Sequence, residues 1–357
     1  MIRGTDDRVC FSRLPRTEAG LQPVRYSVEY YNTEQLPKIQ TSTYVISIMN
    51  CSIVIRAYNE EKYIGRLLEG LKQQTVNDVE IILVDSGSTD STVAIAESHG
   101  AKVVHIPSAE FTFGRSLNLG VRSASREFIV IASAHVYPVY PDWLEALLKP
   151  FQDEKIALAY GKQRGYKNSK YSEHQIFHQW YPDTSILDQA TAFCNNANAA
   201  IRKSLWEQHP YDETLTGLED LEWSKWAKEQ GYKIAYIAEA EIVHIHNETP
   251  KGVYNRYRRE AMALRRMYPE AHFNFYDFIR LTVTNIFSDL WHAALDGVLI
   301  KSFASIVWFR FAQFHGTRMG HRETSLVTPQ LRETFYYARE RKKQDEQKRD
   351  VEPIRYD

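Results

Sequence analysis

The sequence predicts an α/β fold in which a mostly parallel sheet is flanked by helices and followed by a helical C-terminal region. The first observation behind this prediction is an alternation of short apolar runs with helical patterns between Cys51 and Ala132. Such alternation is typical of parallel sheets whose strands are joined by helices. The second observation is a mainly helical pattern from about Tyr254 onward. The third is composition, because 43% of the 357 residues are hydrophobic, enough for a sizeable core.

The alternation begins with a strand-length apolar run at residues 52–55. A helix should follow, because apolar residues between Ile64 and Leu71 lie at i, i+3, i+4 and i+7. Asn59 is the expected N-cap of this helix. Residues 143–202 show no clear period. The later elements are expected as strands at 80–84, 102–106, 128–132 and 234–237, and as helices between Ser88 and Gly100, at 114–125 and at 218–230.

The ends of the predicted strands indicate where a ligand would bind. In sheets of this kind, ligands bind beyond the carboxyl ends of the strands. Arg56, Asp85 and Ser133 come directly after three of the apolar runs, and His135 follows two residues after Ser133. We therefore expect these four residues at the functional edge of the sheet.

Charge and cysteine content exclude several functions. Lys plus Arg total 44 against 45 acidic residues, a net charge of -1, so we expect no nucleic-acid partner. The three cysteines lie far apart, which excludes a disulfide framework or zinc ribbon and favours a reducing compartment. The chain has neither a signal-peptide pattern nor an uncharged apolar stretch of spanning length. We expect a cytoplasmic protein, soluble or at the inner face of the plasma membrane.

Two of the strand ends carry chemical motifs. Residues 53–60 read IVIRAYNE, and residues 82–91 read ILVDSGSTDS. A carboxylate at Asp85 can accept hydrogen bonds from the base or ribose of a nucleotide, while the Gly and Ser residues turn the chain. An ordinary strand-to-helix loop is the alternative explanation.

Two further motifs follow in order. Gly114, Asn118 and Gly120 loosely match a Gly-x-x-x-x-Asn-x-Gly helix, with the first spacing one residue short, and an acidic pair follows at Glu219-Asp220. Over residues 51–250 the four motifs resemble family 2 glycosyltransferases, which have the GT-A fold. The resemblance implies a GT-A-like domain at 50–252. Around it we expect an irregular extension at 1–49, a helical, candidate membrane-associating region at 253–330 and a charged tail at 331–357. The natural start of translation could be Met49.

The resemblance also implies roles for individual residues. Asp85 would contact the nucleotide base, and Arg56 and Asp90 would shape the nucleotide pocket. Asp220 would be the catalytic base, since inverting transfer needs a carboxylate that takes the proton of the attacking hydroxyl. An acidic helix N-terminus is the alternative for Glu219-Asp220, and both can hold. The other residues expected to contact the nucleotide sugar are Tyr58, Glu60, Ser86, Asn118, Ser133, Ala134 and His135.

One departure from the family concerns the metal. The family usually carries Asp-x-Asp after the fourth strand, where this chain has Ser133-Ala134-His135. Imidazole can replace a carboxylate as a metal ligand. The i, i+2 spacing of His244 and His246 on a strand would put both on one face as partners of His135. We therefore expect a divalent ion, Mg²⁺ or Mn²⁺. The alternative is that these histidines make structural hydrogen bonds or touch phosphate directly.

The acceptor side is expected in the segment from Phe193 to Arg202. Small residues there let a sugar approach the backbone, and the amides of Asn196 and Asn198 suit hydroxyl recognition. Glu219 is a further candidate for sugar contact. Asn-rich segments are also typical of turns, which is the alternative.

The C-terminal region bears on location. Five arginines between Arg256 and Arg266 could attract diphosphate or anionic lipid. Residues 278–314 are rich in apolar side chains, interrupted by charges, as in helices that lie in a membrane interface. A helical subdomain or a dimer contact is the alternative.

Together these motifs imply an inverting glycosyltransferase. It would move a sugar from a nucleoside-diphosphate sugar to a hydroxyl of a glycan or lipid-linked acceptor, in surface polysaccharide biosynthesis. One alternative is a non-catalytic nucleotide-binding scaffold subunit of a glycan-assembly complex. The other is a sugar-phosphate nucleotidyltransferase, which would release pyrophosphate rather than a nucleoside diphosphate.

Overall fold

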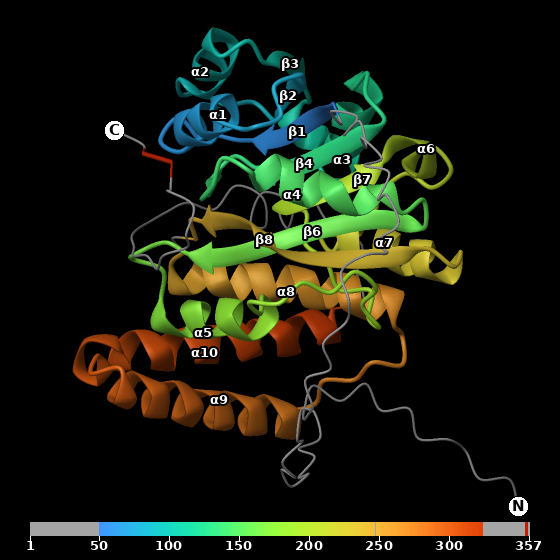
Figure 1. Cartoon of the computed structure of the whole chain (residues 1–357). Coiled ribbons are helices and arrows are strands. Elements are labelled where there is room, and N and C mark those ends of the chain that lie inside the picture. The colour runs from blue at the N-terminus through green and yellow to red at the C-terminus, as the bar shows by residue number, and fades with distance from the viewer. Residues whose placement is uncertain (1–49, 247, 324–353, 356–357) are drawn as a thin grey trace, which may run out of the picture. The chain divides into compact units, whose positions relative to one another are not determined.

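A computed structural model describes residues 50–246, 248–323 and 354–355 (Figure 1). The extension predicted at 1–49 lies outside the described residues. So does the charged tail predicted at 331–357, apart from residues 354–355.

The described residues contain an eight-stranded sheet in the order β3-β2-β1-β4-β7-β6-β8-β5 (Figure 1). β2 and β4 flank β1 in parallel, β3 continues the parallel set, and β6 pairs with β8 in parallel. β7 is antiparallel to both of its neighbours, and β5 is antiparallel to β8. The prediction of a mostly parallel sheet is confirmed. The strands are β1 (Cys51–Ala57), β2 (Val79–Asp85), β3 (Lys102–His105), β4 (Phe128–Ser133), β5 (Val136–Pro138), β6 (Ile156–Gly165), β7 (Asn198–Arg202) and β8 (Lys233–His244).

Helices cover both faces of the sheet because successive strand residues point to opposite sides. In β1, Ile53 and Ile55 join a core with α1 and α4, whereas Val54 joins a second core with α3 and α7. All three side chains are fully buried. The helices of this domain are α1 (Ile64–Lys72), α2 (Thr92–Ser98), α3 (Phe113–Ser123), α4 (Trp143–Leu148), α5 (Tyr171–Trp180), α6 (Lys203–Trp206) and α7 (Glu219–Glu229).

The predicted cap of α1 is wrong. The residue before this helix is Tyr63, and no side chain caps it. Asn59 instead adopts a left-handed conformation with a φ of 56°. Its side-chain oxygen accepts a hydrogen bond from the backbone N–H of Thr89 at 2.7 Å. Asn59 therefore ties the loop after β1 to the loop after β2, at the predicted functional edge.

Two central strands were not predicted. β6 and β7 lie within residues 143–202, where no clear hydrophobic period is visible in the sequence. Ala199 and Ala200 of β7 are fully buried on opposite faces, so this strand shows no alternation of apolar and polar residues. Gly161 lies in β6 where an added Cβ would overlap the carbonyl oxygen of Ala240, so close strand packing requires glycine.

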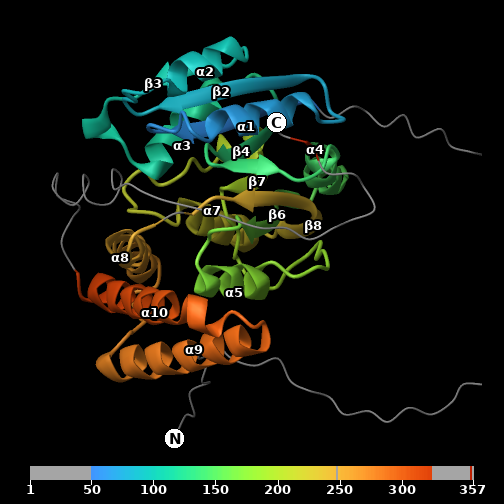
Figure 2. The ribbon, with the colours of Figure 1, turned by 90° about the vertical axis from the view of Figure 1, so that its left-hand side faces the viewer.

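The predicted helical C-terminal region is present as α8 (Pro250–Met267), α9 (Phe275–Leu295) and α10 (Leu299–Arg322). Both views show α10 between α8 and α9 (Figures 1 and 2). An added Cβ on Gly316 of α10 would overlap the carbonyl oxygen of Tyr254 in α8. A buried ion pair joins α10 to α9, with Arg310 Nε 2.7 Å from Asp289 Oδ2. None of the described helices is both long and apolar enough to cross a bilayer.

The close approach of α8 and α10 predicts that Gly316→Leu lowers the free energy of unfolding. The new side chain meets the backbone of α8, and overpacking of this kind costs about 1–3 kcal/mol. Denaturant titration measures the change. Ala294→Leu adds similar bulk at an exposed position of α9 and should leave the unfolding midpoint within about 0.5 kcal/mol of wild type. Equal stability of the two variants would contradict the packing described here.

Candidate active site

A cavity of about 660 Å³ lies at the carboxyl ends of β1 and β4. It is lined by the loop after β1, the segment around Phe111 and Phe113, residues 195–197, the start of α7 and one side of α8. The sequence prediction placed the functional edge at these strand ends. The predicted residues that line the cavity are Arg56, Tyr58, Glu60, Ser86, Asp90, Ser133, His135, Asn196, Glu219, Asp220, His244 and His246.

Asp85 ends β2 but does not line this cavity. Its carboxylate is almost fully buried and accepts the backbone N–H groups of Gly87 at 3.0 Å and Ser88 at 3.2 Å. His105 at the end of β3 was not predicted, and its Nδ1 lies 3.4 Å from the same carboxylate. Because the His105 side chain is 67% exposed, Asp85 and His105 form a polar edge beside the cavity.

Besides Asp85, three predicted contact residues do not line the cavity, and these three assignments are corrected. Asn118 is buried, where its oxygen accepts from Trp206 Nε1 at 2.9 Å and its amide donates to the carbonyl of Tyr211. Asn198 is fully buried in β7, with its oxygen accepting from Trp143 Nε1 at 2.9 Å. Ala134 is buried under the turn after β4. The two amides satisfy buried indole N–H groups, which an isolated motif cannot reveal.

The acidic pair lies in the first turn of α7. Leu218, directly before the helix, has a φ of 58°. Asp220 Oδ2 accepts the backbone N–H of Asn196 at 2.9 Å. Glu219 Oε1 lies 3.3 Å from Arg56 Nη1. The guanidinium of Arg56 in turn stacks over the ring of Phe113, 4.5 Å from its centroid.

The environment of Asp220 changes its acidity. Burial, followed by the charge of Glu219, raises the pKa of Asp220 to about 7. Hydrogen bonds from the backbone of Asn196 and Leu221 and the charge of Arg56 oppose this shift. A carboxyl with a pKa near neutrality can exchange a proton with a bound hydroxyl at physiological pH.

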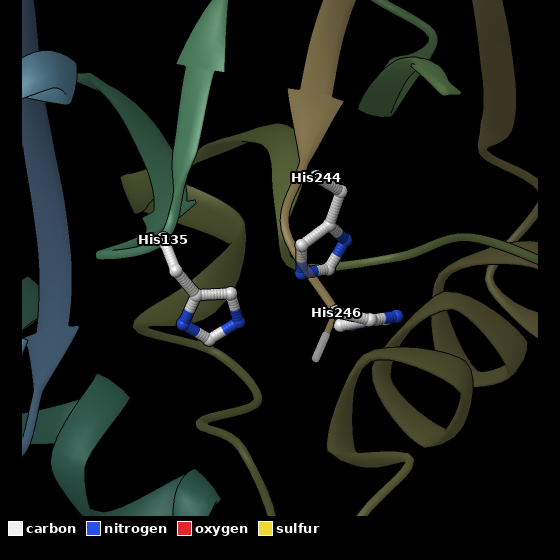
Figure 3. A group of neighbouring side chains, drawn as sticks. All are labelled: His135, His244 and His246. Carbon is white, nitrogen blue, oxygen red and sulfur yellow. The ribbon is translucent and has the colours of Figure 1, made fainter. Parts of the chain in front are cut away.

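The three histidines, which also line the cavity, lie close together (Figure 3). His135 lies in the turn after β4, His244 ends β8, and His246 lies two residues further. Their ligand atoms all lie within 4.8 Å of one another. The backbone N–H of Ile245 donates to the carbonyl of His135 at 3.1 Å, which holds the turn against the end of β8. The spacing prediction that His244 and His246 share a face agrees with their ring centroids, 3.9 Å apart.

Two of the three histidines are held in the neutral form. Burial lowers the pKa of His244 well below its ordinary value, and the neighbouring His246 and His135 add to the effect. Burial, then Arg256 and His135, lowers the pKa of His246 in the same way. For His135, burial lowers the pKa, but the charge and hydrogen bond of Glu60 outweigh it and raise the pKa above its ordinary value. Neutral imidazole is the form that coordinates metal ions. The side-chain chemistry of this cluster therefore fits a divalent transition ion.

Helix α8 supplies Arg256 and Arg259 to the cavity, two of the five arginines expected to attract diphosphate or anionic lipid. Arg256 Nη2 lies 3.0 Å from Glu173 Oε1 and 2.7 Å from Glu248 Oε2. The guanidinium of Arg259 lies 4.6 Å from the centroid of the Phe113 ring, which Arg56 also contacts. All three residues line the cavity. The basic run of α8 was visible in the sequence, but its division between faces was not.

The protein family follows from comparison with known sequences. The model of glycosyl transferase family 2 matches residues 52–209. The O-antigen chain rhamnosyltransferase RfbN of Salmonella typhimurium is 30% identical over 222 residues, covering 58% of this chain and 70% of RfbN. The chain therefore belongs to glycosyl transferase family 2, as the motifs predicted, and it is a glycosyltransferase.

Two further relatives show the extent of the likeness. The O-antigen chain rhamnosyltransferase WbaN of Salmonella anatum is 30% identical over 198 residues, covering 52% of this chain and 62% of WbaN. The mannosyltransferase PcManGT of Pyrobaculum calidifontis, solved with GDP-Man and Mn²⁺, is 17% identical. It covers 74% of this chain and 84% of its own, with a TM-score of 0.50. This last likeness is one of fold, and it agrees with the predicted GT-A-like architecture.

The electrostatics of the acidic pair predict that Glu219→Gln lowers the pKa of Asp220 from about 7, because a charge that raises it is removed. Carboxyl ¹³C NMR titration of aspartate-labelled protein measures the value, with Asp220→Asn identifying the signal. Glu222→Gln, one turn away in α7 and paired with His209, is the matched control and should leave the value unchanged. Titration of wild-type Asp220 near the ordinary aspartate pKa of about 3.9 would contradict the burial argument.

Proposed function

We propose that this glycosyltransferase inverts the configuration of a sugar as it moves it from a nucleoside-diphosphate donor to a hydroxyl of a glycan or lipid-linked acceptor. The observation that carries the proposal is Asp220, a buried carboxyl with a raised pKa at the wall of the cavity. The two O-antigen rhamnosyltransferases named above support a role in surface polysaccharide synthesis. They also make nucleoside-diphosphate rhamnose the first donor to test.

The reaction needs one base and one site for the leaving group. The acceptor oxygen attacks the anomeric carbon, the bond from that carbon to the diphosphate breaks, and the nucleoside diphosphate leaves. The Asp220 carboxylate takes the hydroxyl proton as the new bond forms. The ion pair with Glu219 holds Arg56 near this carboxylate. The charge of Arg56 favours the charged form of Asp220, whereas the charge of Glu219 opposes it. Asn196, whose backbone orients Asp220, is proposed to contact the acceptor sugar.

The opposite wall of the cavity is proposed to hold the diphosphate. His135, His244 and His246 would bind a divalent ion there, in place of the Asp-x-Asp carboxylates. When bound, such an ion neutralises the charge of the departing diphosphate. Tyr58, Glu60, Ser86, Asp90 and Ser133, which line the same side, are proposed to hold the donor. Asp85, together with His105, is proposed to contact the nucleotide base beside the cavity.

We also propose that α9 and α10 contact a membrane. Eleven of the fourteen large hydrophobic side chains exposed among the described residues lie on these two helices. On α9 the exposed side chains recur every four residues, at Ile279, Val283, Phe287, Trp291 and Leu295. Exposed Arg280, Lys301 and Arg322 lie on the same helices and would favour anionic lipid. This contact would bring the enzyme to a lipid-linked acceptor.

The base assignment predicts that Asp220→Asn lowers the transfer rate by about 10²–10⁴-fold while nucleotide binding persists. Amide replaces carboxylate with little change in size, so the cavity keeps its shape but loses the proton acceptor. Transfer is measured with nucleoside-diphosphate rhamnose, and nucleotide affinity by calorimetry. Glu222→Gln in the same helix should retain wild-type transfer. Normal turnover by Asp220→Asn would refute the role of Asp220 as base.

The membrane contact predicts that Phe287→Ser and Trp291→Ser each weaken binding to vesicles of anionic phospholipid by roughly tenfold. Full burial of a large apolar side chain contributes about 1.5–3 kcal/mol, so a partly buried one contributes roughly 1.4 kcal/mol, which corresponds to a factor of ten in affinity. Vesicle sedimentation measures the partition. Trp180→Ser, an exposed tryptophan on α5, is the matched control. If neither variant changes vesicle binding but both dissociate a dimer, the face is a contact between two copies.

A further inference from the structure

The three histidines of the cavity share one arrangement of hydrogen bonds. The Nδ1 atom of His135 lies 2.9 Å from Glu60 Oε1. That of His244 lies 2.8 Å from Gln163 Oε1, and that of His246 lies 2.8 Å from Glu173 Oε1. The three acceptors come from the loop after β1, from β6 and from α5. Three separate elements therefore hold the same ring atom in each histidine.

This arrangement selects one tautomer. A carboxylate can only accept a hydrogen bond, as can the oxygen of an amide, so the Nδ1 atoms of His135 and His244 carry the proton and donate it. His246 Nδ1 also lies 3.4 Å from Arg256 Nη1, which is a donor, but the closer Glu173 oxygen at 2.8 Å favours the same tautomer. A neutral ring protonated at Nδ1 keeps its lone pair on Nε2. All three Nε2 atoms are then free to coordinate. Acceptors of this kind behind ligand histidines fix ring orientation and raise ligand basicity.

His244 gives a second, independent indication of a ligand. Its side chain is buried, and its Nε2 atom has no hydrogen-bond partner among the described residues. A buried polar atom without a partner costs about 1–3 kcal/mol, so such atoms are rare unless they serve a function. A purely structural cluster would be expected to have hydrogen bonds between its rings. In the described part of the chain, no hydrogen bond joins two of these three rings. A bound cation would satisfy His244 Nε2.

The ligand set also indicates the class of ion. Mg²⁺ prefers oxygen ligands and keeps several waters, whereas imidazole suits first-row transition ions. Here the nearest carboxylates, Glu60 and Glu173, are used by the Nδ1 atoms and stand behind the rings. In an Asp-x-Asp motif the ligands themselves carry the negative charge. Here the proposed ligands are imidazoles, and the negative charge lies on Glu60 and Glu173, which orient two of them.

We propose that His135, His244 and His246 form a three-imidazole centre that is selective for a transition dication over Mg²⁺ and is oriented by Glu60, Gln163 and Glu173. The proposal rests on the proposed divalent ion of the donor site and adds its chemical class and three positioning residues. Glu60 and Glu173 also supply the charge that neutral ligands lack. Gln163 supplies orientation alone.

The test measures metal binding directly, without nucleotide or turnover. Metal-free protein is titrated with Co²⁺, Mn²⁺ and Mg²⁺ by calorimetry, and the Co²⁺ complex is followed by its visible absorption. Wild type should bind Co²⁺ and Mn²⁺ at least tenfold more tightly than Mg²⁺. His135→Ala and His244→Ala should lose the Co²⁺ spectrum. Equal affinity for Mg²⁺ would overturn the selectivity.

The positioning residues are tested by reciprocal charge changes. Glu173→Gln keeps the size of the acceptor but removes its charge, and should weaken Co²⁺ binding by roughly 10–100-fold and change the absorption spectrum. Gln163→Glu adds a charge behind His244 and should strengthen binding. Glu222→Gln removes the carboxylate of the unrelated pair with His209 and should change neither. Thermal unfolding shows whether each variant is folded.

The outcomes separate this inference from the proposed function. If wild type binds Co²⁺ but Glu173→Gln and Gln163→Glu bind it as wild type does, the positioning roles are wrong and the metal site stands. If wild type binds no transition ion, both the inference and the proposed metal are wrong, while the Asp220 test of transfer is unaffected. Should Glu173→Gln unfold because Arg256 loses its partner, Gln163→Glu and Glu60→Gln still decide the question.

Discussion

The ion pairs of Arg256 hold the helical C-terminal region against the α/β domain, and the cavity depends on them. This one side chain lies within 3.0 Å of Glu173 in α5 and 2.7 Å of Glu248 in the loop after β8. Burial raises the pKa of Glu173, Glu248 and Glu260, and the charge of Arg256 opposes the shift in each. Buried charges are tolerated only when they are paired. Without Arg256, three carboxyls would face one another beside the histidine cluster.

Backbone pairing explains why histidines distant in sequence meet. β5 is antiparallel to β8, with Val136 opposite His244. The turn before β5 therefore lies beside the end of β8, and the hydrogen bond from Ile245 to His135 extends this pairing by one step. Since His244 and His246 flank Ile245, their side chains emerge on the same side, and their ring centroids lie 5.1 and 6.1 Å from that of His135 (Figure 3). Ser133-Ala134-His135, which stands in place of a carboxylate motif, supplies only one candidate metal ligand. The other two, His244 and His246, come from the end of β8.

Sequence reasoning was reliable where one residue type has one physical role. The parallel strands β1, β2, β3 and β4 are apolar runs bounded by turn residues, and all were predicted near their observed bounds. The roles of asparagines could not be predicted in this way. Asn118 and Asn198 accept hydrogen bonds from the indole N–H groups of buried tryptophans, whereas Asn196 lines the cavity. Nothing in the local sequence separates these cases.

The residues behind the histidines were beyond sequence analysis for a different reason. Gln163 contacts a histidine 81 positions away, and Glu173 one 73 positions away. Gln163 lies in β6, a central strand that has no amphipathic pattern to reveal it. Its side chain was therefore neither placed in the sheet nor assigned a partner. Long-range contacts of this kind follow from topology and register, which a single sequence leaves open.

Helix α8 lies between the cavity and helix α10, and it contacts both. Arg256 and Arg259 face the cavity, whereas the backbone of Tyr254 and Arg258 receives Gly316 and Gly320 of α10. The residues on the two sides are one to five positions apart in the same helix, so a rotation of α8 that adjusted one contact would disturb the other. α10 in turn carries part of the exposed apolar face, with Phe303, Val307 and Phe311. The close glycine contacts therefore fix the position of this exposed face relative to the side of α8 that lines the cavity.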